Sequence, residues 1–306
     1  MRRILVTGAG GLVGSALVQH LSERGEEVIP LVSRQQCDLT VPTEVSALMK
    51  FVRPTHIFHL AASVFGVGGN LKFPAEVFYR NTIMNTTLVE ACHNFGVEKI
   101  VAMGSAAMYA DGLEQPMRES DAMLGEPHGS EYGYAMSKRT LLAQLKTYRQ
   151  QYDLNFGFVI ATNMYGPRDM FNTLHGHVVP SLLKKFLDAE ESGEEVEIWG
   201  DGTPTRDFLY SADAASGLMA IMDHGEGSYN LATGISVPIS HLVIEIAAHF
   251  PQVRYRWNVD KPKGQISRSY DVSLLRALGF VPRYSLHEGI AETVSWLREY
   301  REDIRK

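Results

Sequence analysis

Cysteine is scarce in this chain, and so is excess positive charge. Only Cys37 and Cys92 occur among 306 residues, so neither a disulfide framework nor a four-cysteine zinc site is available. The 29 lysines and arginines are outnumbered by 35 aspartates and glutamates, which leaves a net charge of −6. This balance argues against a nucleic-acid-binding surface. We expect neither a metal site nor a nucleic-acid partner.

Long hydrophobic runs are also missing. No segment approaches the roughly 18 consecutive apolar residues that a membrane-spanning helix needs. The N-terminal stretch MRRILVTGAGG enters a glycine loop after a short apolar run, so it lacks the hydrophobic region of a secretory signal. There is no low-complexity tract, internal repeat or linker. The sequence therefore predicts a cytoplasmic protein with no membrane partner.

What the chain does have is a regular alternation of short apolar runs and helical patterns. Residues 2–32 predict a strand, a glycine turn, an amphipathic helix and a second strand. Helices are predicted at 44–54, 81–96 and 134–153, and strands at 55–62, 97–105 and 155–166. Strands that alternate with helices form a mainly parallel sheet covered on both faces.

Two irregular regions interrupt this alternation, at 163–206 and at about 236–284. We therefore predict an α/β protein: a Rossmann-type doubly wound parallel sheet with a smaller C-terminal substrate-binding lobe. The NADP-binding Rossmann domain is expected to comprise residues 1–162 and about 207–235. The lobe that binds a sugar nucleotide is expected to comprise about 163–206 and 236–306.

The first turn of the predicted sheet has the composition of a dinucleotide-binding loop. The stretch TGAGGLVG places Gly8, Gly11 and Gly14 between the first strand and the first helix, with Leu12 and Val13 in the same turn. Glycines allow a tight turn and a close approach to a pyrophosphate, which then lies on the helix N-terminus. A glycine triplet alone is weak evidence, but its place at the start of a βαβ unit makes it specific.

The end of the second predicted strand indicates which dinucleotide binds. An NAD enzyme usually has an acidic residue there for the ribose 2′-hydroxyl, whereas an NADP enzyme has a basic one. This chain reads PLVSRQQCDL, with Arg34 in that place and no carboxylate before Asp38. A guanidinium pairs with a 2′-phosphate, so we expect NADPH, with Asp38 and Leu39 beside the adenine ring. The alternative is that Arg34 is a solvated surface residue.

The motif YAMSK predicts the reacting groups. Tyr134 and Lys138 are four residues apart in a helical pattern, so they lie on one face. A tyrosine with a pKa near ~10 is a poor acid–base unless a nearby cation favours its phenolate. Lys138 is expected to do this and to hold the nicotinamide ribose. Ser105, at the end of the preceding strand, supplies a hydroxyl that orients the substrate oxygen.

These motifs together resemble the extended short-chain dehydrogenases/reductases and, within them, the GDP-L-fucose synthase family. The resemblance covers nearly the whole chain and includes ILVTGAGGLVGSAL, PTHIFHLAA, YGYAMSKR, TNMYGPRDMFN, GHVVPSLL and EIWGDGTPTRDFLY. It implies an NADPH-dependent oxidoreductase with a GDP-sugar substrate. It also implies a homodimer formed by the helices at Asn81 to Phe95 and Tyr134 to Tyr152, and it adds Ala61 and Ala62 to the cofactor-binding residues.

The resemblance also assigns the catalytic residues, and one of them is missing. Ser105, Tyr134 and Lys138 match the reduction triad, and His177 in GHVVP matches the acid–base histidine of a 3,5-epimerisation. An alternative for His177 is a helix-start histidine bonded to the backbone. The partner of that histidine in the family is a cysteine, in a pattern like Gly-Ser-Ser-Cys-Ile-Tyr-Pro. Here the stretch is GSAAMYA, with Ala107 in the place of the cysteine.

Further positions match the part of the family that binds the sugar nucleotide. The expected substrate-binding residues are Asn163, His177, Lys185, Trp199, Arg206 and Arg268. Lysine and arginine would bind the diphosphate, and Trp199 has core packing as its alternative. Two stretches depart from the family pattern, VFGVGGN and KPKG, where Lys263 replaces an acid. The sugar is accordingly expected to be either a hexose or a heptose.

An alanine has no proton to exchange, whereas inversion at C3 and C5 needs two acid–base groups. The sequence therefore predicts a 4-ketoreductase of a GDP-4-keto-6-deoxy sugar whose epimerase step is weak or lost. The alternatives are a complete bifunctional epimerase/reductase, a non-catalytic nucleotide-binding regulator, and an NAD-dependent dehydrogenase that runs the reverse oxidation.

Overall fold

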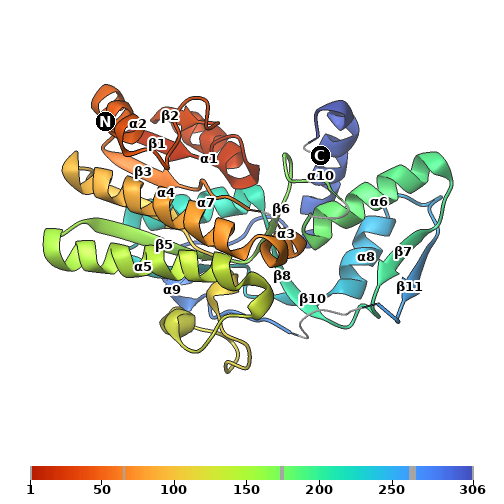
Figure 1. The fold of residues 1–306 in the computed structure, drawn as a ribbon. Coiled ribbons are helices and arrows are strands. Elements are labelled where there is room, and N and C mark those ends of the chain that lie inside the picture. The colour runs from red at the N-terminus through yellow and green to blue at the C-terminus, as the bar shows by residue number, and fades with distance from the viewer. Residues whose placement is uncertain (1, 65, 173–175, 262–266, 305–306) are drawn as a thin grey trace.

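A parallel sheet of six strands is the centre of the larger lobe of the molecule (Figure 1). The computed structural model describes residues 2–64, 66–172, 176–261 and 267–304. The strands lie in the order β2 (Glu27–Leu31), β1 (Arg3–Thr7), β3 (His56–His59), β4 (Lys99–Met103), β5 (Asn155–Ala161) and β9 (Gly227–Leu231). The chain leaves β1 for β2 and then crosses back to β3, so the strand order reverses between β1 and β3.

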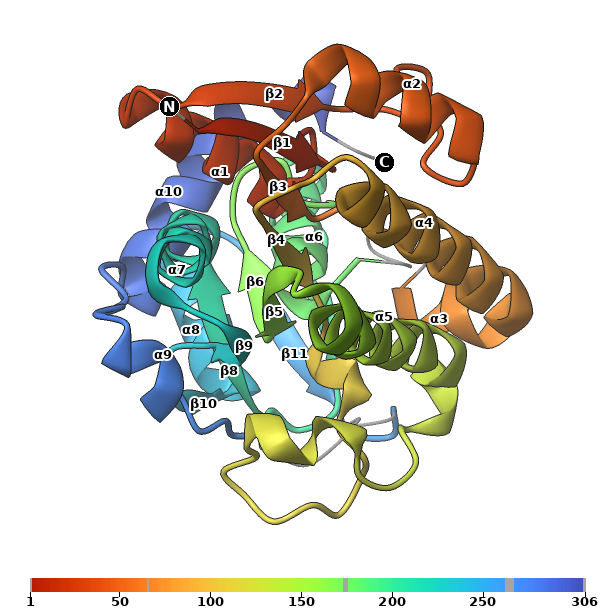
Figure 2. The ribbon, with the colours of Figure 1, turned by 90° about the vertical axis from the view of Figure 1, so that its left-hand side faces the viewer.

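Helices cover both faces of this sheet (Figure 2). One face carries α2 (Pro42–Val52), α4 (Pro74–Asn94) and α5 (Tyr132–Tyr152), and the other carries α1 (Leu12–Glu23) and α7 (Ser211–His224). Each face has its own cluster of buried apolar side chains, with Leu88 and Leu141 in one and Leu17 and Leu218 in the other. The predicted doubly wound α/β fold is confirmed.

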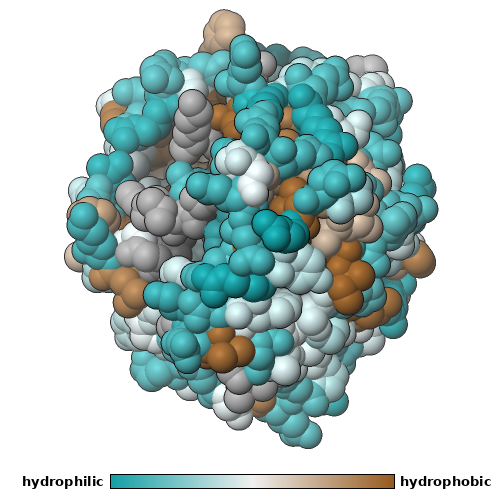
Figure 3. Space-filling view, turned by 90° about the vertical axis from the view of Figure 1, so that its right-hand side faces the viewer, coloured by the Kyte–Doolittle hydropathy of each residue, from teal (hydrophilic) through white to brown (hydrophobic). Residues whose placement is uncertain are grey.

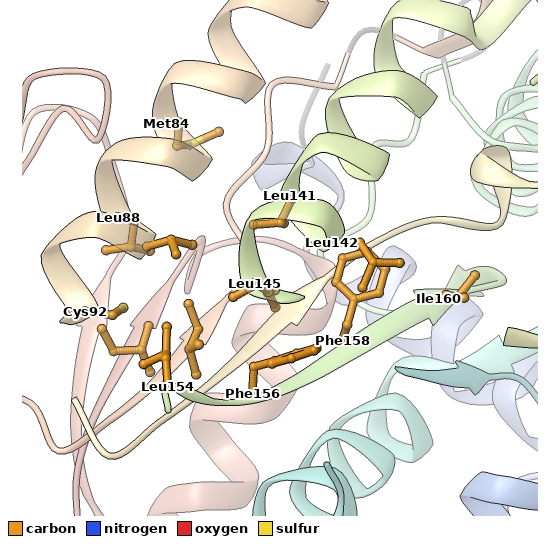
Figure 4. Close-up of a cluster of buried hydrophobic side chains, with 14 of the residues drawn as sticks. Met84, Leu88, Cys92, Leu141, Leu142, Leu145, Leu154, Phe156, Phe158 and Ile160 are labelled. Carbon is orange, nitrogen blue, oxygen red and sulfur yellow. The ribbon is translucent and has the colours of Figure 1, made fainter. Parts of the chain in front are cut away.

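The packing of α4 and α5 on the sheet accounts for the buried apolar side chains of these two helices. Leu88 and Cys92 from α4 and Leu145 from α5 point into one cluster with Phe156 and Phe158 of β5 (Figure 4). All five side chains are buried. Burial raises the pKa of the Cys92 thiol far above its usual range, so this cysteine is a core residue and not a reactive thiol.

The second lobe has a separate hydrophobic cluster. Its helices are α6 (Val178–Ser192), α8 (Ile239–Ala247) and α10 (Leu286–Glu299). Its strands are β6 (Asn163–Tyr165), β8 (Thr205–Tyr210) and β10 (Ser236–Pro238) in one sheet, and β7 (Val196–Trp199) and β11 (Tyr255–Asn258) in another. The surface on this side is mainly hydrophilic, with scattered hydrophobic residues (Figure 3).

Short elements complete the chain. They are α3 (Gly66–Lys72), α9 (Ser273–Ala277), and the 3₁₀ turns η1 (Ala106–Met108), η2 (Glu119–Met123), η3 (Gly129–Glu131) and η4 (Arg301–Asp303). Tyr270, Val272 and Leu275 were expected in the substrate lobe, but their side chains pack in the two clusters of the large sheet. These side chains pack against the sheet because the chain returns from the second lobe at this point and covers β9.

Within the described ranges, no helix has both the length and the apolar character needed to cross a bilayer. The same residues contain no group of three or more histidine, cysteine, aspartate or glutamate side chains arranged to hold a metal ion.

Candidate active site

A deep cleft of about 920 Å³ opens at the carboxyl ends of β1, β3 and β4, where the strand order reverses. Ligands of open α/β sheets bind at this kind of position. The first turn contributes Gly8, Gly11, Leu12, Val13 and Gly14, and the end of β3 contributes Leu60 and Ala62. The second lobe closes the other side with Asn163, His177 and Arg206. The cleft therefore lies between the two lobes.

The glycine turn of this cleft fits a dinucleotide. Gly8 has φ +70°, a backbone conformation that side chains rarely adopt. A Cβ atom on Gly8 would lie 2.8 Å from the Ala61 nitrogen, and one on Gly14 would lie 2.1 Å from the Gly8 oxygen. The N-cap residue Gly11 has no capping side chain, so the N-terminus of α1 is open to a pyrophosphate. The loop can hold the predicted cofactor.

The residues expected at the adenosine end lie away from the lining of the cleft. Arg34 donates from both Nε and Nη2 to Asp38 Oδ2, at 3.0 and 2.6 Å. Thr40 donates to the other oxygen of the Asp38 carboxylate. Leu39 is buried in the core and is not on the surface of the cleft. Arg34 remains exposed, and its ion pair with Asp38 was not anticipated from the sequence.

The three predicted reduction residues meet at the base of the cleft. Ser105 hydrogen bonds to the Tyr134 hydroxyl, and all three residues line the cleft. Lys138 Nζ lies 5.7 Å from the centroid of the Tyr134 ring and donates to the Met103 carbonyl at 2.8 Å. The end of β4 positions Ser105, while α5 presents Tyr134 and Lys138 on one face. The geometry is that of a hydroxyl pair with an ammonium beside it.

Burial sets the protonation states of this group. It raises the pKa of Tyr134 to about 12, with the Glu131 charge adding to the rise and the Ser105 hydrogen bond opposing it. Burial lowers the pKa of Lys138 to about 8. The sequence had predicted that Lys138 would favour the Tyr134 phenolate. In the structure burial dominates the pKa of Tyr134, so the phenol is protonated at neutral pH.

The alanines of the GSAAMYA stretch form part of the same wall. Ala106 and Ala107 line the cleft next to Ser105, at the turn η1. Neither Cys37 nor Cys92 is among the residues lining this cleft, and both are buried. The described residues therefore place no thiol on the wall of the cleft.

His177 faces the cleft as the N-cap residue of α6. Its imidazole makes no capping hydrogen bond to that helix, so the alternative of a histidine bonded to the helix start does not hold. Asn163 lines the cleft and donates to the Asp207 carbonyl at 3.2 Å.

Two arginines bring positive charge to the lobe side of the cleft. Burial lowers the pKa of Arg206, and the nearby Arg268 guanidinium lowers it further. Arg268 Nη1 donates to the Ala106 carbonyl at 3.0 Å. Two neighbouring guanidinium groups repel each other, and a bound anion such as a diphosphate relieves that repulsion.

Lys185 and Trp199 are not brought into the cleft lining. Lys185 Nζ donates to the Glu197 carbonyl at 3.0 Å and lies 5.8 Å from the Trp199 ring. Lys261 Nζ lies 5.6 Å from the same ring. Trp199 is 58% exposed, so the alternative of core packing is wrong. Lys263, expected to replace an acid, lies outside the described residues, as does Phe65 of the VFGVGGN stretch.

Several lining residues were not found from the sequence. They are Asn70, Asp111, His128, Ser130, Glu131, Thr162, Arg168, Asp169 and Tyr270. Most belong to loops that have no periodicity, and their positions depend on how distant segments fold together. Thr162, Arg168 and Asp169 stand in the TNMYGPRDMFN stretch that carries the resemblance. The other local signal was that the long loop between β4 and α5 begins and ends at predicted catalytic residues.

Comparisons with known proteins place this geometry in context. A family model described as the NAD dependent epimerase/dehydratase family matches residues 4–232. A GDP-L-fucose synthase from Sinorhizobium fredii is 33% identical over 298 residues, which cover 95% of this chain and 94% of that protein.

Solved structures are similar over nearly the same length. A GDP-L-fucose synthetase from Naegleria fowleri bound to NADP has a TM-score of 0.92 and 30% identity, covering 99% of this chain and 96% of that one. A GDP-mannoheptose C4 reductase from Campylobacter jejuni with NADP bound has a TM-score of 0.86 and 25% identity, covering 96% of this chain and 98% of that one.

Proposed function

The chain belongs to the NAD dependent epimerase/dehydratase family, and from this membership we propose that it is an NADPH-dependent 4-ketoreductase of a GDP-4-keto-6-deoxy sugar. The sugar is a hexose or a heptose, and the 3,5-epimerase step is weak or lost. Support for the cofactor and the GDP-sugar comes from the NADP bound to the Naegleria relative and from the activities for which the relatives are named.

The observation that carries the reductase proposal is the hydrogen-bonded pair of Ser105 and Tyr134 beside Lys138 in the cleft. When bound, NADPH supplies the hydride that converts the C4 carbonyl to an alcohol. Tyr134 donates a proton to the C4 oxygen, which its raised pKa permits because the phenol is protonated at neutral pH. The Ser105 hydroxyl orients the same oxygen.

Lys138 completes this proton transfer. After Tyr134 has given up its proton, the ammonium group of Lys138 stabilises the phenolate by charge attraction. Its hydrogen bond to the Met103 carbonyl fixes the side chain at the end of β4. Solvent then returns a proton to the phenolate. Lys138 must be charged for this role.

The loss of epimerase activity is proposed from Ala107. Removal and return of protons at C3 and C5 uses two groups with pKa values near the working pH, and loss of one costs roughly 10²–10⁴ in rate. His177 can serve as one such group, but Ala107 stands where the family has the other. The main alternative is a complete bifunctional epimerase/reductase, in which His177 or water performs both proton transfers.

The proposal is tested by NADPH oxidation with a GDP-4-keto-6-deoxyhexose and its heptose counterpart, followed by NMR of the products. We expect reduction at C4 without inversion at C3 or C5. Tyr134→Phe is expected to lower the rate about 10²–10⁴-fold, whereas the exposed Tyr132→Phe on the same helix serves as the control. Failure to oxidise NADPH with either sugar would indicate the non-catalytic regulator instead.

A further inference from the structure

Three charged or titratable side chains outside the reduction triad meet in the cleft. Asp111 lies in the loop after η1, His128 lies before η3, and Arg268 reaches the same place from a distant part of the chain. Asp111 Oδ2 is 3.8 Å from His128 Nε2, and Asp111 Oδ1 is 3.8 Å from Arg268 Nη2. The carboxylate therefore lies between two nitrogen donors.

The contacts of the His128 ring identify which nitrogen carries the proton. The backbone N–H of Ser130 donates to His128 Nδ1 at 3.3 Å. A nitrogen that accepts from a backbone N–H has no proton of its own, so the proton of the neutral ring is on Nε2. His128 thus presents an N–H group on the side of Asp111.

Arg268 presents a second donor to the same carboxylate. Its Nη1 is held by the Ala106 carbonyl, which fixes the guanidinium beside the wall that contains Ala107. Its Nη2 is buried and makes no hydrogen bond within the described ranges. A buried donor without a partner is unfavourable, and a ligand oxygen at this position would satisfy it.

We propose that Asp111, His128 and Arg268 form a recognition site for a vicinal diol of the substrate sugar, an inference that rests on the proposed ketoreductase function. Both separations of 3.8 Å exceed the range of a direct hydrogen bond. A hydroxyl group near each gap can donate to one carboxylate oxygen and accept from Nε2 or Nη2. Two adjacent hydroxyls match the two oxygens and two donors.

The charge of Asp111 distinguishes this ligand from a phosphate. A carboxylate repels a phosphate group, whereas it forms charge-assisted hydrogen bonds with hydroxyls. The diphosphate is therefore expected at the Arg206 side of Arg268, and the diol at the Asp111 side. The diol has two possible sources: the C2 and C3 hydroxyls of the ring, which a 4-keto-6-deoxy sugar retains, or the exocyclic C6 and C7 hydroxyls of a heptose that is not deoxygenated at C6.

The test compares kcat/KM for three GDP-4-keto sugars in the unmodified protein and in Asp111→Asn. The sugars are a mannoheptose with free C6 and C7 hydroxyls, the 6-deoxymannose derivative, and the 3-deoxy form of that derivative. A hydrogen bond to a charged group implies an effect of about 10- to 100-fold. For each pair of sugars we take the ratio of kcat/KM for the sugar with the recognised diol to kcat/KM for the sugar without it. We expect Asp111→Asn to lower this ratio by about 10- to 100-fold.

Each outcome has a separate meaning. A lowered heptose-to-deoxyhexose ratio assigns the exocyclic diol, and a lowered ratio of deoxyhexose to its 3-deoxy form assigns the ring diol. His128→Ala is expected to lower the same ratio, and Glu114→Gln, in an exposed acid of the same loop that does not line the cleft, is the control. Unchanged ratios in both active-site variants would overturn the inference. Failure of the unmodified protein to reduce all three sugars would instead overturn the proposed function on which it rests.

Discussion

At the scale of single residues, the chemistry of the cleft is set by burial. Tyr134 and Lys138 are shifted in opposite directions, with pKa values of about 12 and about 8, because desolvation disfavours the charged form of each. The result is a protonated phenol beside an ammonium group at neutral pH. This combination suits proton donation to a ketone.

Lys138 also gives a pH dependence with a definite sign. It is charged below its pKa and neutral above it, so the stabilisation of the Tyr134 phenolate is lost as the pH rises through about 8. We predict that kcat/KM for ketoreduction falls above this pH while Tyr134 is still protonated. A pH–rate profile of the unmodified protein measures the fall. A profile flat to pH values well above 8 would contradict the role of Lys138.

Arg34 determines the choice of cofactor in this account. To bind the 2′-phosphate, Arg34 must redirect part of its guanidinium away from Asp38. A charge-assisted contact of this kind at an exposed site is expected to change the affinity for NADPH about 10-fold. We predict that Arg34→Ala weakens NADPH binding by this factor and leaves NADH binding unchanged, as measured by fluorescence titration. Arg80→Ala, which breaks another exposed pair with an acid four residues away, is the control. Equal losses for both cofactors would count against the assignment.

At the scale of elements, a buried chain of polar side chains joins two strands of the sheet to α4. Thr7 Oγ1 on β1 accepts from the Leu60 and Ala61 nitrogens, so its own hydrogen is directed to His59 Nδ1 at 2.9 Å. His59 Nε2 then donates to Asn85 Oδ1 on α4 at 2.9 Å. This chain requires a neutral His59 ring between β3 and α4.

Because the folded protein keeps the His59 ring neutral, its free energy of unfolding depends on pH. Burial lowers the pKa of His59 to about 4, with the Lys138 charge adding to it. Between about 6.5 and about 4 the unfolded chain takes up a proton that the folded protein does not, so stability falls as the pH falls. The shift corresponds to roughly 3 kcal/mol. We predict a loss of this order in the free energy of unfolding, measured by urea titration at several pH values.

A matched variant isolates that effect. His56 is another histidine on β3, and burial lowers its pKa as well. His59→Gln is expected to remove most of the acid-dependent loss, whereas His56→Gln leaves it largely in place. The same pH dependence in both variants would show that His59 is not its source.

The limits of prediction also appear at this scale. Strands and helices were predicted well where apolar residues repeat, and Ser105, Tyr134 and Lys138 were found because a strand end and one helix face position them. The helix predicted at 81–96 begins earlier, at Pro74. Its first turns were missed because they expose Phe78 and Tyr79 and therefore lack the apolar period of a single buried face. Asp111 and His128 were missed because they meet through loop folding and not through spacing.

At the scale of the whole molecule, the homodimer is expected to form through α4 and α5. Both helices lie on one face of the sheet, and α4 exposes Phe78 and Tyr79. Burial of exposed aromatic surface favours association. We predict a mass twice that of the 34.0 kDa chain by light scattering, and a monomer for Phe78→Glu combined with Tyr79→Glu. Phe51→Glu, in an exposed aromatic on α2, is the control, and a monomeric unmodified protein would refute the prediction.

The most direct test of the whole account is deuterium uptake by the substrate in D₂O. With a GDP-4-keto-6-deoxyhexose and NADPH, we predict reduction at C4 while uptake at C3 and C5 stays roughly 10²-fold or more below the rate of reduction. Ala107→Cys is expected to raise that uptake, and Ala106→Cys is the matched thiol at the neighbouring position. Uptake at both carbons as fast as reduction in the unmodified protein would contradict the loss of the epimerase step.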